Sequence, residues 1–221
     1  MPGIILAFLM AALIPMTGLE WGTILNDEDL ADAVSSGQIN FLAIAGLIVS
    51  WGVVTLWIFV SWHRFILLEE YPQGWIPKFR ADRIGAYFLA GLRLLGILLA
   101  MMMVIVLLAM ITGGIAMLLT FVLGVIVYRF VAILPAAAIG QQLTLGESWN
   151  ATLGATGSII VMMILFFLLQ IVLSFVINLT AQLIPAIGIA SQMTVTLFMS
   201  FVNVSVMTTF YGHYVEKRKI D

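Results

Sequence analysis

The segment 128–157, YRFVAILPAAAIGQQLTLGESWNATLGATG, decides the fold that the sequence predicts. The residues Tyr128-Arg129 end one apolar stretch, and Pro135 interrupts a helix that would continue through it. Thr144 and Glu147 then form a capping-box pattern, in which a hydroxyl and a carboxylate each bond a free backbone amide at the start of a helix. The segment therefore predicts that one long apolar helix ends here and that a second helix begins and runs into the next apolar stretch.

The composition of the chain excludes a soluble globular domain. Hydrophobic residues make up 63% of the 221 residues and charged residues 9%, whereas soluble domains carry about 25% charged residues. The stretches 33–62, 94–128 and 148–215 contain no Asp, Glu, Lys or Arg. Because backbone polar groups in lipid must be satisfied internally, we expect these stretches to form helices. The predicted fold class is all-α, a polytopic helical membrane protein.

The apolar stretches predict six transmembrane helices arranged as three hairpins. A span needs roughly 20 apolar residues, and we place the spans at about residues 3–19, 39–62, 85–111, 115–134, 157–184 and 187–214. An acidic loop, 20–38, follows the first span, and polar segments follow the second and fourth spans at 63–86 and 135–156. The first stretch lacks the basic residues of a signal peptide, which is the rival interpretation, so we expect a retained span.

The positions of the basic residues predict the orientation of the chain. All nine Lys and Arg residues fall on the side of segments 63–86 and 135–156 and of the C-terminus, or just inside that boundary. The acidic loop 20–38, on the opposite side, contains no basic residue. Cytoplasmic segments of membrane proteins carry the excess of Lys and Arg. We therefore expect both termini to be cytoplasmic and the loop 20–38 to be periplasmic.

Short motifs recur at the expected cytoplasmic boundaries. They are Arg129-Phe130, Leu134-Pro135-Ala136, Glu147-Ser148-Trp149 and Thr152-x-Gly154, together with His63-Arg64-Phe65, Arg83-Ile84 and Tyr87. Over about residues 40–215 this pattern resembles a bacterial family of six-helix membrane proteins, which includes the membrane domain attached to some glycerophosphodiester phosphodiesterases and also stand-alone members. The resemblance implies a fold and a bacterial inner membrane. It implies no activity, because the sequence does not contain the phosphodiesterase catalytic domain with its acidic and His metal ligands.

Residues suited to catalysis or metal binding are scarce. The chain has no Cys and two His, His63 and His213, both expected at the cytoplasmic interface. These two side chains could form a metal or haem site across the hairpins, but interfacial residues of this kind more often accompany the surrounding aromatic side chains. A hydrolase or metalloenzyme needs clustered catalytic or ligating groups. We therefore predict no catalytic residue, no metal, no cofactor and no nucleic-acid partner.

The basic residues near the cytoplasmic boundary are candidates for contact with lipid. Anionic headgroups attract such residues with about 1 kcal/mol each, so we expect a lipid-headgroup role for Lys78, Arg80, Arg83 and Arg129; a solvated charged loop is the alternative. Arg93 is the one charged residue expected well inside a span, since Arg129 lies near the cytoplasmic boundary of its span. A long Arg side chain can extend to the membrane surface, which we favour over a role in transport.

Polar amides in the last two spans predict contacts between those helices. If the chain reverses at Pro185, residues equally far from it lie at equal depth, which gives the pairs Asn178–Gln192 and Gln170–Asn203. Amides facing lipid are costly, so inward pairing is expected. The alternatives are that each amide bonds a backbone carbonyl or lines a cavity.

These observations favour a non-catalytic integral inner-membrane protein that is an accessory or scaffolding partner of a larger membrane assembly. Its expected partners are anionic membrane lipids and other integral membrane proteins. The alternative function is that of a small transporter or lipid-handling protein with a site between helical hairpins. A cavity that reached Arg93 or Gln170 would favour transport.

Overall fold

The structure is a computed structural model that describes residues 14–18, 35–37, 39–72, 74, 76–112, 118–183 and 185–219. Most of the expected first span, 3–19, and of the acidic loop, 20–38, lies outside these residues. The described part of the chain contains helices and no strand. Its elements are η1 (Ile14–Thr17), α4 (Phe41–Leu68), α5 (Ala81–Thr112), α6 (Leu118–Phe130), α7 (Ile133–Ile139), α8 (Leu145–Ala151), η3 (Leu153–Ala155), α9 (Thr156–Leu183) and α10 (Pro185–Tyr214).

The prediction of an all-helical chain with several membrane-crossing helices is confirmed for the described residues. Five segments are long and apolar enough to cross a membrane, namely Phe41–Leu68, Ala81–Thr112, Leu119–Ile139, Leu153–Gln182 and Thr194–Tyr214. Their bounds follow the expected second to sixth spans. The chain is therefore a multi-pass helical membrane protein.

Helix α4 extends further than the sequence suggested. The Asn40 side chain accepts a hydrogen bond of 3.1 Å from the amide of Ala43 and caps the start of the helix. The segment after Trp62, expected to be a polar connection, remains helical to Leu68, and Glu69 then adopts a left-handed conformation with a φ of 53°. His63 and Arg64, at the expected cytoplasmic boundary, lie within the helix, and both side chains have hydrogen-bond partners in the protein.

The break in the fourth span also differs from the expectation. Helix α6 ends at Phe130, and a turn at residues 131–132 precedes α7. Pro135 lies in the first turn of α7, where a missing N–H breaks no helical hydrogen bond. The turn therefore comes before Pro135 and not at it. Gly140, with a φ of 90°, ends α7 in the left-handed conformation that glycine adopts without strain.

The segment after α7 begins as predicted. Thr144 caps α8: its hydroxyl accepts a 3.2 Å bond from the Glu147 amide, and its own amide donates a 2.7 Å bond to the Glu147 carboxylate. The predicted capping box is thus confirmed. Helix α8 passes through η3 into α9, so the chain turns from one apolar helix to the next within the segment 128–157.

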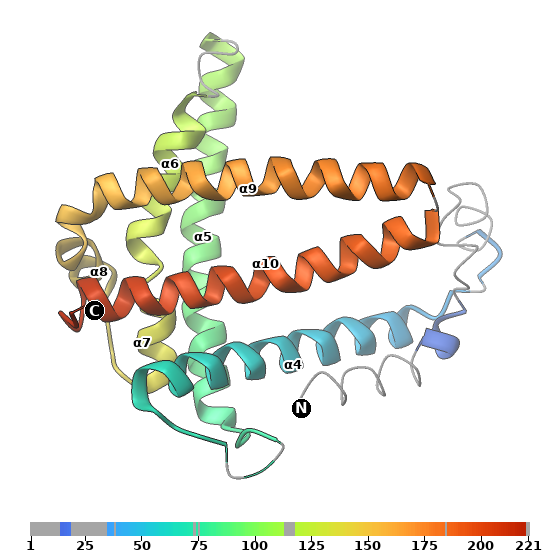
Figure 1. The fold of residues 1–221 in the computed structure, drawn as a ribbon, viewed down its shortest axis with the longest axis horizontal. Helices are drawn as coiled ribbons and strands as arrows, with labels where there is room; N and C mark the ends of the chain where they lie inside the picture. The colour runs from blue at the N-terminus through green and yellow to red at the C-terminus, as the bar shows by residue number, and fades with distance from the viewer. Residues whose placement is uncertain are drawn as a thin grey trace.

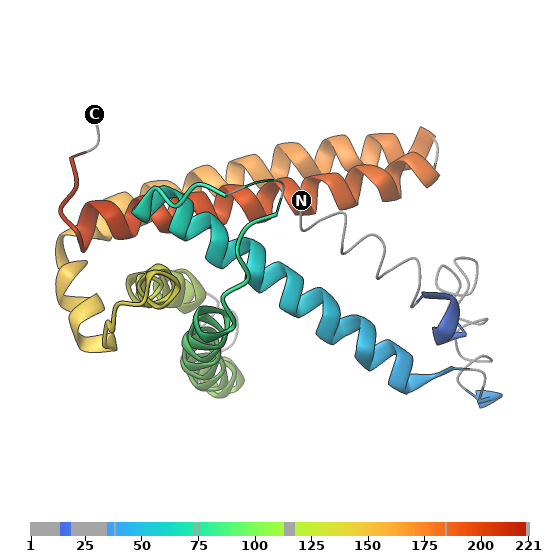
Figure 2. The ribbon, with the colours of Figure 1, turned by 90° about the horizontal axis from the view of Figure 1, so that it is seen from below.

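The long helices run in two directions. Helices α9 and α10 lie side by side with opposite chain directions, and α4 contacts α10 (Figure 1). Helix α5, which contacts α6, crosses this group instead of lying along it; α5 is seen nearly end-on in Figure 2 while α9 and α10 lie across the view. The described helices therefore cross one another at a common junction.

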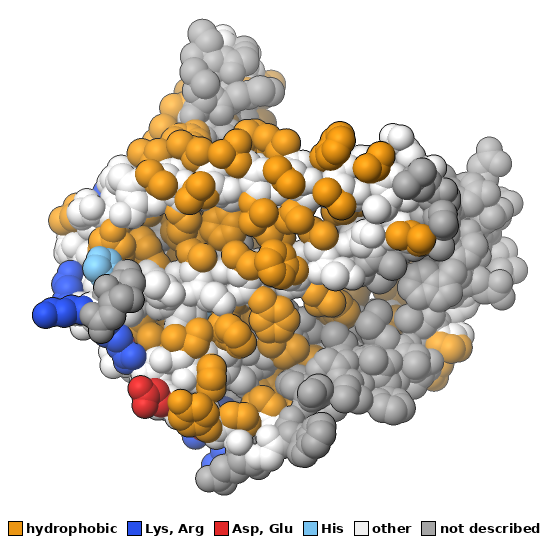
Figure 3. Space-filling view, in the orientation of Figure 1, with side chains coloured by type: hydrophobic (Ala, Val, Ile, Leu, Met, Phe, Trp, Pro, Cys, Tyr) orange, Lys and Arg blue, Asp and Glu red, His pale blue; other side chains and the backbone are white. Residues whose placement is uncertain are grey.

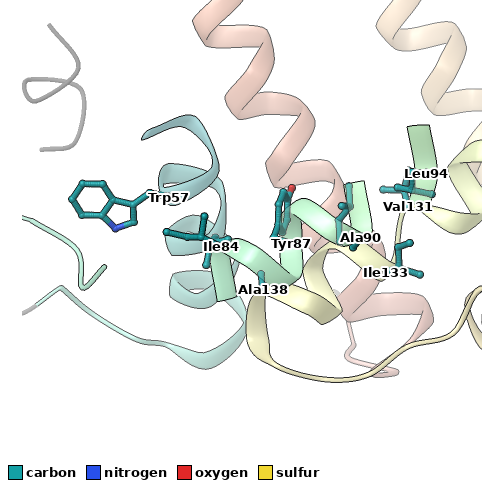
Figure 4. Packing of buried hydrophobic residues seen from close by; sticks show 10 residues of the cluster. Trp57, Ile84, Tyr87, Ala90, Leu94, Val131, Ile133 and Ala138 are labelled. Atoms are coloured by element: carbon teal, nitrogen blue, oxygen red, sulfur yellow. The ribbon is translucent and has the colours of Figure 1, made fainter. Parts of the chain in front are cut away.

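Helix α7 forms the centre of that junction. It contacts α4, α5 and α10. Ala136 and Ala138 of α7, and Ala132 just before it, are completely buried. Methyl side chains allow helix backbones to approach closely. Around them, Trp57 and Val60 of α4, side chains of α5 and the start of α7 form one apolar cluster (Figure 4).

Away from the junction, much of the surface of the apolar helices is not covered by other parts of the described chain. The most apolar stretch of α5 has no buried residue, and that of α9 has few. Figure 3 shows hydrophobic side chains spread along the exposed faces of the long helices. Lipid or another membrane protein must cover these faces.

Enlarging the centre of the junction should separate the helices. We expect Ala136→Leu to lower the free energy of unfolding by about 1–3 kcal/mol, because added methylenes in a close-packed site force neighbouring side chains apart. Unfolding in mixed detergent micelles measures this change. Ala100→Leu, at an exposed position of α5, is the matched control and should have little effect. Equal effects of the two substitutions would contradict the central role of α7.

Candidate functional site

A hydrogen-bonded group of three side chains lies inside the junction. His63 of α4 and Thr208 of α10 are completely buried, and Tyr87 of α5 is 5% exposed. The distance from His63 Nδ1 to Thr208 Oγ1 is 2.7 Å, and that from His63 Nε2 to Tyr87 Oη is 3.3 Å. The group therefore connects three helices that are distant in sequence.

The hydrogen bonds define how His63 is protonated. Thr208 Oγ1 donates its one proton to the carbonyl of Val204, at 2.7 Å. The hydroxyl oxygen must then accept from His63, so Nδ1 carries the imidazole proton and Nε2 accepts from the Tyr87 hydroxyl. Every polar atom of the ring has a partner in the neutral form. This arrangement fixes three helices together and leaves no free nitrogen for a metal ion.

The two histidines, both expected at the cytoplasmic interface, differ in their surroundings. His63 is a core residue, whereas His213 is exposed and donates from Nδ1 to the carbonyl of Arg218 at 3.3 Å. The two imidazoles thus have different partners. No group of three or more His, Cys, Asp or Glu suited to a metal ion occurs among the residues that the structure describes.

Arg129 lies in a second polar site, where α6 meets η3 and α9. The residue is 8% exposed, and its Nη2 donates to the carbonyl of Leu153 at 3.2 Å and to the hydroxyl of Thr156. Its guanidinium lies over the ring of Trp149, 4.6 Å from the centroid, a contact that stabilises a cation. Of the four cations expected to contact lipid headgroups, Arg129 is therefore the one most enclosed by protein.

The backbone of Arg129 is held as firmly as its side chain. Its carbonyl accepts a 2.7 Å bond from the hydroxyl of Ser148, which is completely buried. The buried Thr152 hydroxyl lies 3.4 Å from the same carbonyl and donates to the Ser148 carbonyl at 2.8 Å. The last turn of a helix leaves carbonyls without partners, and the Ser148 hydroxyl supplies one. The residues of the segment 128–157 thus bond to one another across the turn.

The other three candidate cations lie in the loop after α4, which carries Lys78 and Arg80, and in the first turn of α5, which carries Arg83. Arg83 Nε pairs with Asp82 at 3.0 Å, and its guanidinium occupies the space that a Cβ at Gly140 would need. Arg80 pairs with Glu70 at 2.6 Å. Lys78 is exposed and forms no ion pair with a described residue.

Glu70 is the centre of this charged group, and the sequence analysis gave it no role. Its carboxylate accepts from Arg64 Nε at 2.7 Å and from Arg80 Nη2 at 2.6 Å. Burial alone would raise the pKa of Glu70, but the hydrogen bonds from Arg80 and Arg64 and their positive charge outweigh it, so the pKa is lowered. Arg64 also donates to the carbonyl of Ala138 at 3.2 Å. The Glu70 bridge thus connects α4, the loop after it and α7.

The tail of the chain joins the same end of the molecule. Arg218 Nη2 donates to the carbonyl of Leu67 at 2.6 Å. The Tyr211 hydroxyl donates to the side chain of Gln141 at 3.3 Å. The ends of α4, α7 and α10 are therefore adjacent.

Two of the four amides of the last two spans form hydrogen bonds within their own helices. Asn178 Nδ2 donates to the carbonyl of Ser174 at 2.8 Å, and Gln192 Nε2 donates to Thr196 Oγ1 at 3.3 Å, so both bonds stay within one helix. Gln170 is exposed on α9. Asn203 lines an apolar groove. No hydrogen bond joins either pair among the described residues, so pairing between the helices stays a prediction.

The groove beside Asn203 has a volume of about 480 Å³ and lies between α4, α5 and α10. Its lining is apolar except for Asn203, Ser200 and the Tyr87 hydroxyl. Neither Arg93 nor Gln170 lines it. Arg93 is exposed on α5, about 18 Å along the helix from Ala81 at about 1.5 Å per residue.

Comparisons with models of protein families, with curated proteins and with solved structures find no match to this chain.

Removing the Thr208 hydroxyl should test the buried group. In Thr208→Val the Nδ1–H of His63 loses its acceptor, and we expect the free energy of unfolding to fall by about 1–3 kcal/mol, the usual cost of an unsatisfied buried polar group. Unfolding in mixed micelles is the measurement. Thr209→Val is the matched control, because Thr209 is exposed on the same helix and bonds only the Ser205 carbonyl. If both substitutions cost the same, the His63 group does not stabilise the junction.

Proposed function

We propose that this chain is a non-catalytic integral protein of the bacterial inner membrane and an accessory or scaffolding subunit of a larger membrane assembly. The observation that carries the proposal is the apolar surface of α5. No residue of the most apolar stretch of this helix is buried, and the helix crosses the group formed by α4, α9 and α10 (Figure 1). A helix that is attached at one end and open along its length offers a large face to a second membrane protein.

The buried polar groups support the non-catalytic part of the proposal. The His63 imidazole, the Thr208 hydroxyl and the Arg129 carbonyl all take part in bonds between helices. A catalytic group must instead face a site where a substrate can lie. In the part of the chain that the structure describes, these groups serve to join helices.

The topology that accompanies this proposal has six spans in three hairpins, with both termini in the cytoplasm. It is supported by the adjacency of the ends of α4, α7 and α10, which Arg218 and Tyr211 bond together. The segments that carry the basic residues are thus neighbours in space. The excess of Lys and Arg at that end supports a cytoplasmic location for it. The motifs at these ends are also those that resemble the six-helix bacterial family.

A transporter or lipid-handling protein is the second candidate, and the groove lined by Asn203 favours it. An apolar groove of about 480 Å³ with two or three polar groups is typical of a small-molecule site. A lipid chain would cover the groove without satisfying the Asn203 amide. We favour the accessory role because no residue of the most apolar stretch of α5 is buried, whereas the groove is confined to the region between α4, α5 and α10.

Reporter fusions test the topology. A reporter fused after Lys219 should be active in the cytoplasm, and one inserted near Asp29 should be active in the periplasm, because the basic residues lie on the first side only. Finding both reporters on the same side would contradict the six-span topology.

Site-specific photo-crosslinking in cells tests the accessory role. Leu99 and Met103 of α5 are 60% and 63% exposed and lie on one face of the helix. With a photoreactive residue at either position, we expect a discrete adduct with another membrane protein. Gly146, exposed on α8, is the control position outside the spans and should give no such adduct. Adducts with lipid alone at both α5 positions would favour the lipid-handling alternative.

A further inference from the structure

A polar pocket lies between the last turns of α4 and the loop that follows it. Its volume is about 470 Å³, and its lining includes Val60, Ser61 and Arg64 of α4 together with Glu70, Lys78 and Arg80 of the loop. The loop is held against the helix by the Glu70 bridge and by Phe79, whose ring packs edge-on against Trp57 with centroids 5.3 Å apart. Residues from two segments thus form a defined concave site.

The pocket carries an excess of positive charge. Arg64, Lys78 and Arg80 contribute three positive charges and Glu70 one negative charge, which leaves two positive charges. Glu70 accepts bonds from both guanidinium groups and holds them in place. The ammonium of Lys78 and the Nη1 of Arg80 keep donors that Glu70 does not use. The pocket is therefore suited to an anion with several oxygens.

The surroundings of the pocket indicate where that anion comes from. Tyr71 and Ile76, which line the pocket, are 68% and 51% exposed, and the neighbouring Phe79 is 52% exposed. Apolar and aromatic side chains at the end of a transmembrane helix lie among lipid headgroups and the first acyl carbons. A ligand that fits this site has an anionic group that binds the cations and an apolar part that packs against these exposed side chains.

We propose that this pocket binds the headgroup phosphate of an anionic phospholipid. The phosphate oxygens accept hydrogen bonds from Lys78 and Arg80, and Glu70 keeps Arg64 and Arg80 in position. A zwitterionic headgroup would bring its own cation next to the three basic residues, so the pocket discriminates by charge. The site includes Arg64, which was not among the residues expected to contact lipid headgroups, and excludes Arg83 and Arg129, which pair elsewhere.

The inference rests on the membrane location of the chain and not on the accessory role, so the two proposals fail separately. The experiment uses the purified full chain in nanodiscs of phosphatidylcholine that contain phosphatidylglycerol, and native mass spectrometry measures the retained phosphatidylglycerol. We expect Lys78→Gln to lower retention about fivefold, the factor that corresponds to about 1 kcal/mol for one cation at a membrane surface. The variant Lys78→Gln leaves the Glu70 bridge intact, so the fold is preserved.

The variant Lys219→Gln is the matched control, since it removes one positive charge from the same end of the molecule outside the pocket. This variant should retain as much phosphatidylglycerol as the native chain. Equal losses in Lys78→Gln and Lys219→Gln would overturn the proposal, because general surface charge would then explain the binding. Displacement of the lipid by millimolar inorganic phosphate would also overturn it, because the site would then take free phosphate.

Discussion

The constraint on which this structure depends is that polar groups inside the membrane must bond to one another. Lipid offers them no partner. Burying one polar group without a hydrogen bond costs roughly several kcal/mol, which is comparable to the free energy of unfolding of a small protein. The His63, Thr208 and Tyr87 side chains meet this constraint by bonding across α4, α5 and α10. Their pairing fixes the rotation of each helix about its own axis, which apolar contacts alone do not specify. The alanines of α7 then fill the space that these three helices leave.

A second set of bonds determines how α6 passes into α9. Ser148 donates to the carbonyl of Arg129, while the Arg129 side chain donates to the backbone carbonyl of Leu153. The segment after α6 thus supplies a donor for a carbonyl at the end of that helix and an acceptor for the Arg129 guanidinium. The turn is short and polar, yet it is as enclosed as the apolar core. The Glu70 bridge likewise uses bonds between side chains to connect α4 with the loop that follows it.

The sequence predicts the helices well and their arrangement poorly. Uncharged stretches give the positions of α4, α5, α9 and α10, because the length of a span is set by the bilayer, and the spacing of Thr144 and Glu147 gives the start of α8. The burial of His63 has no such signal, since a polar residue at the end of an apolar stretch also fits a membrane boundary. The crossing of α5 over the other helices is likewise not predicted. Lipid and protein interior are equally apolar, so the hydrophobic pattern does not tell which face of a span packs on protein.

The length of α4 has a consequence for the shape of the protein. Its 28 residues extend about 42 Å, more than the roughly 30 Å of a bilayer core, and helices that exceed this thickness tilt. Helices α4 and α10 lie close together near their C-terminal ends and diverge toward the other end (Figure 2). We therefore expect the tilt of α4, and with it the angle between α4 and α10, to depend on the thickness of the surrounding bilayer.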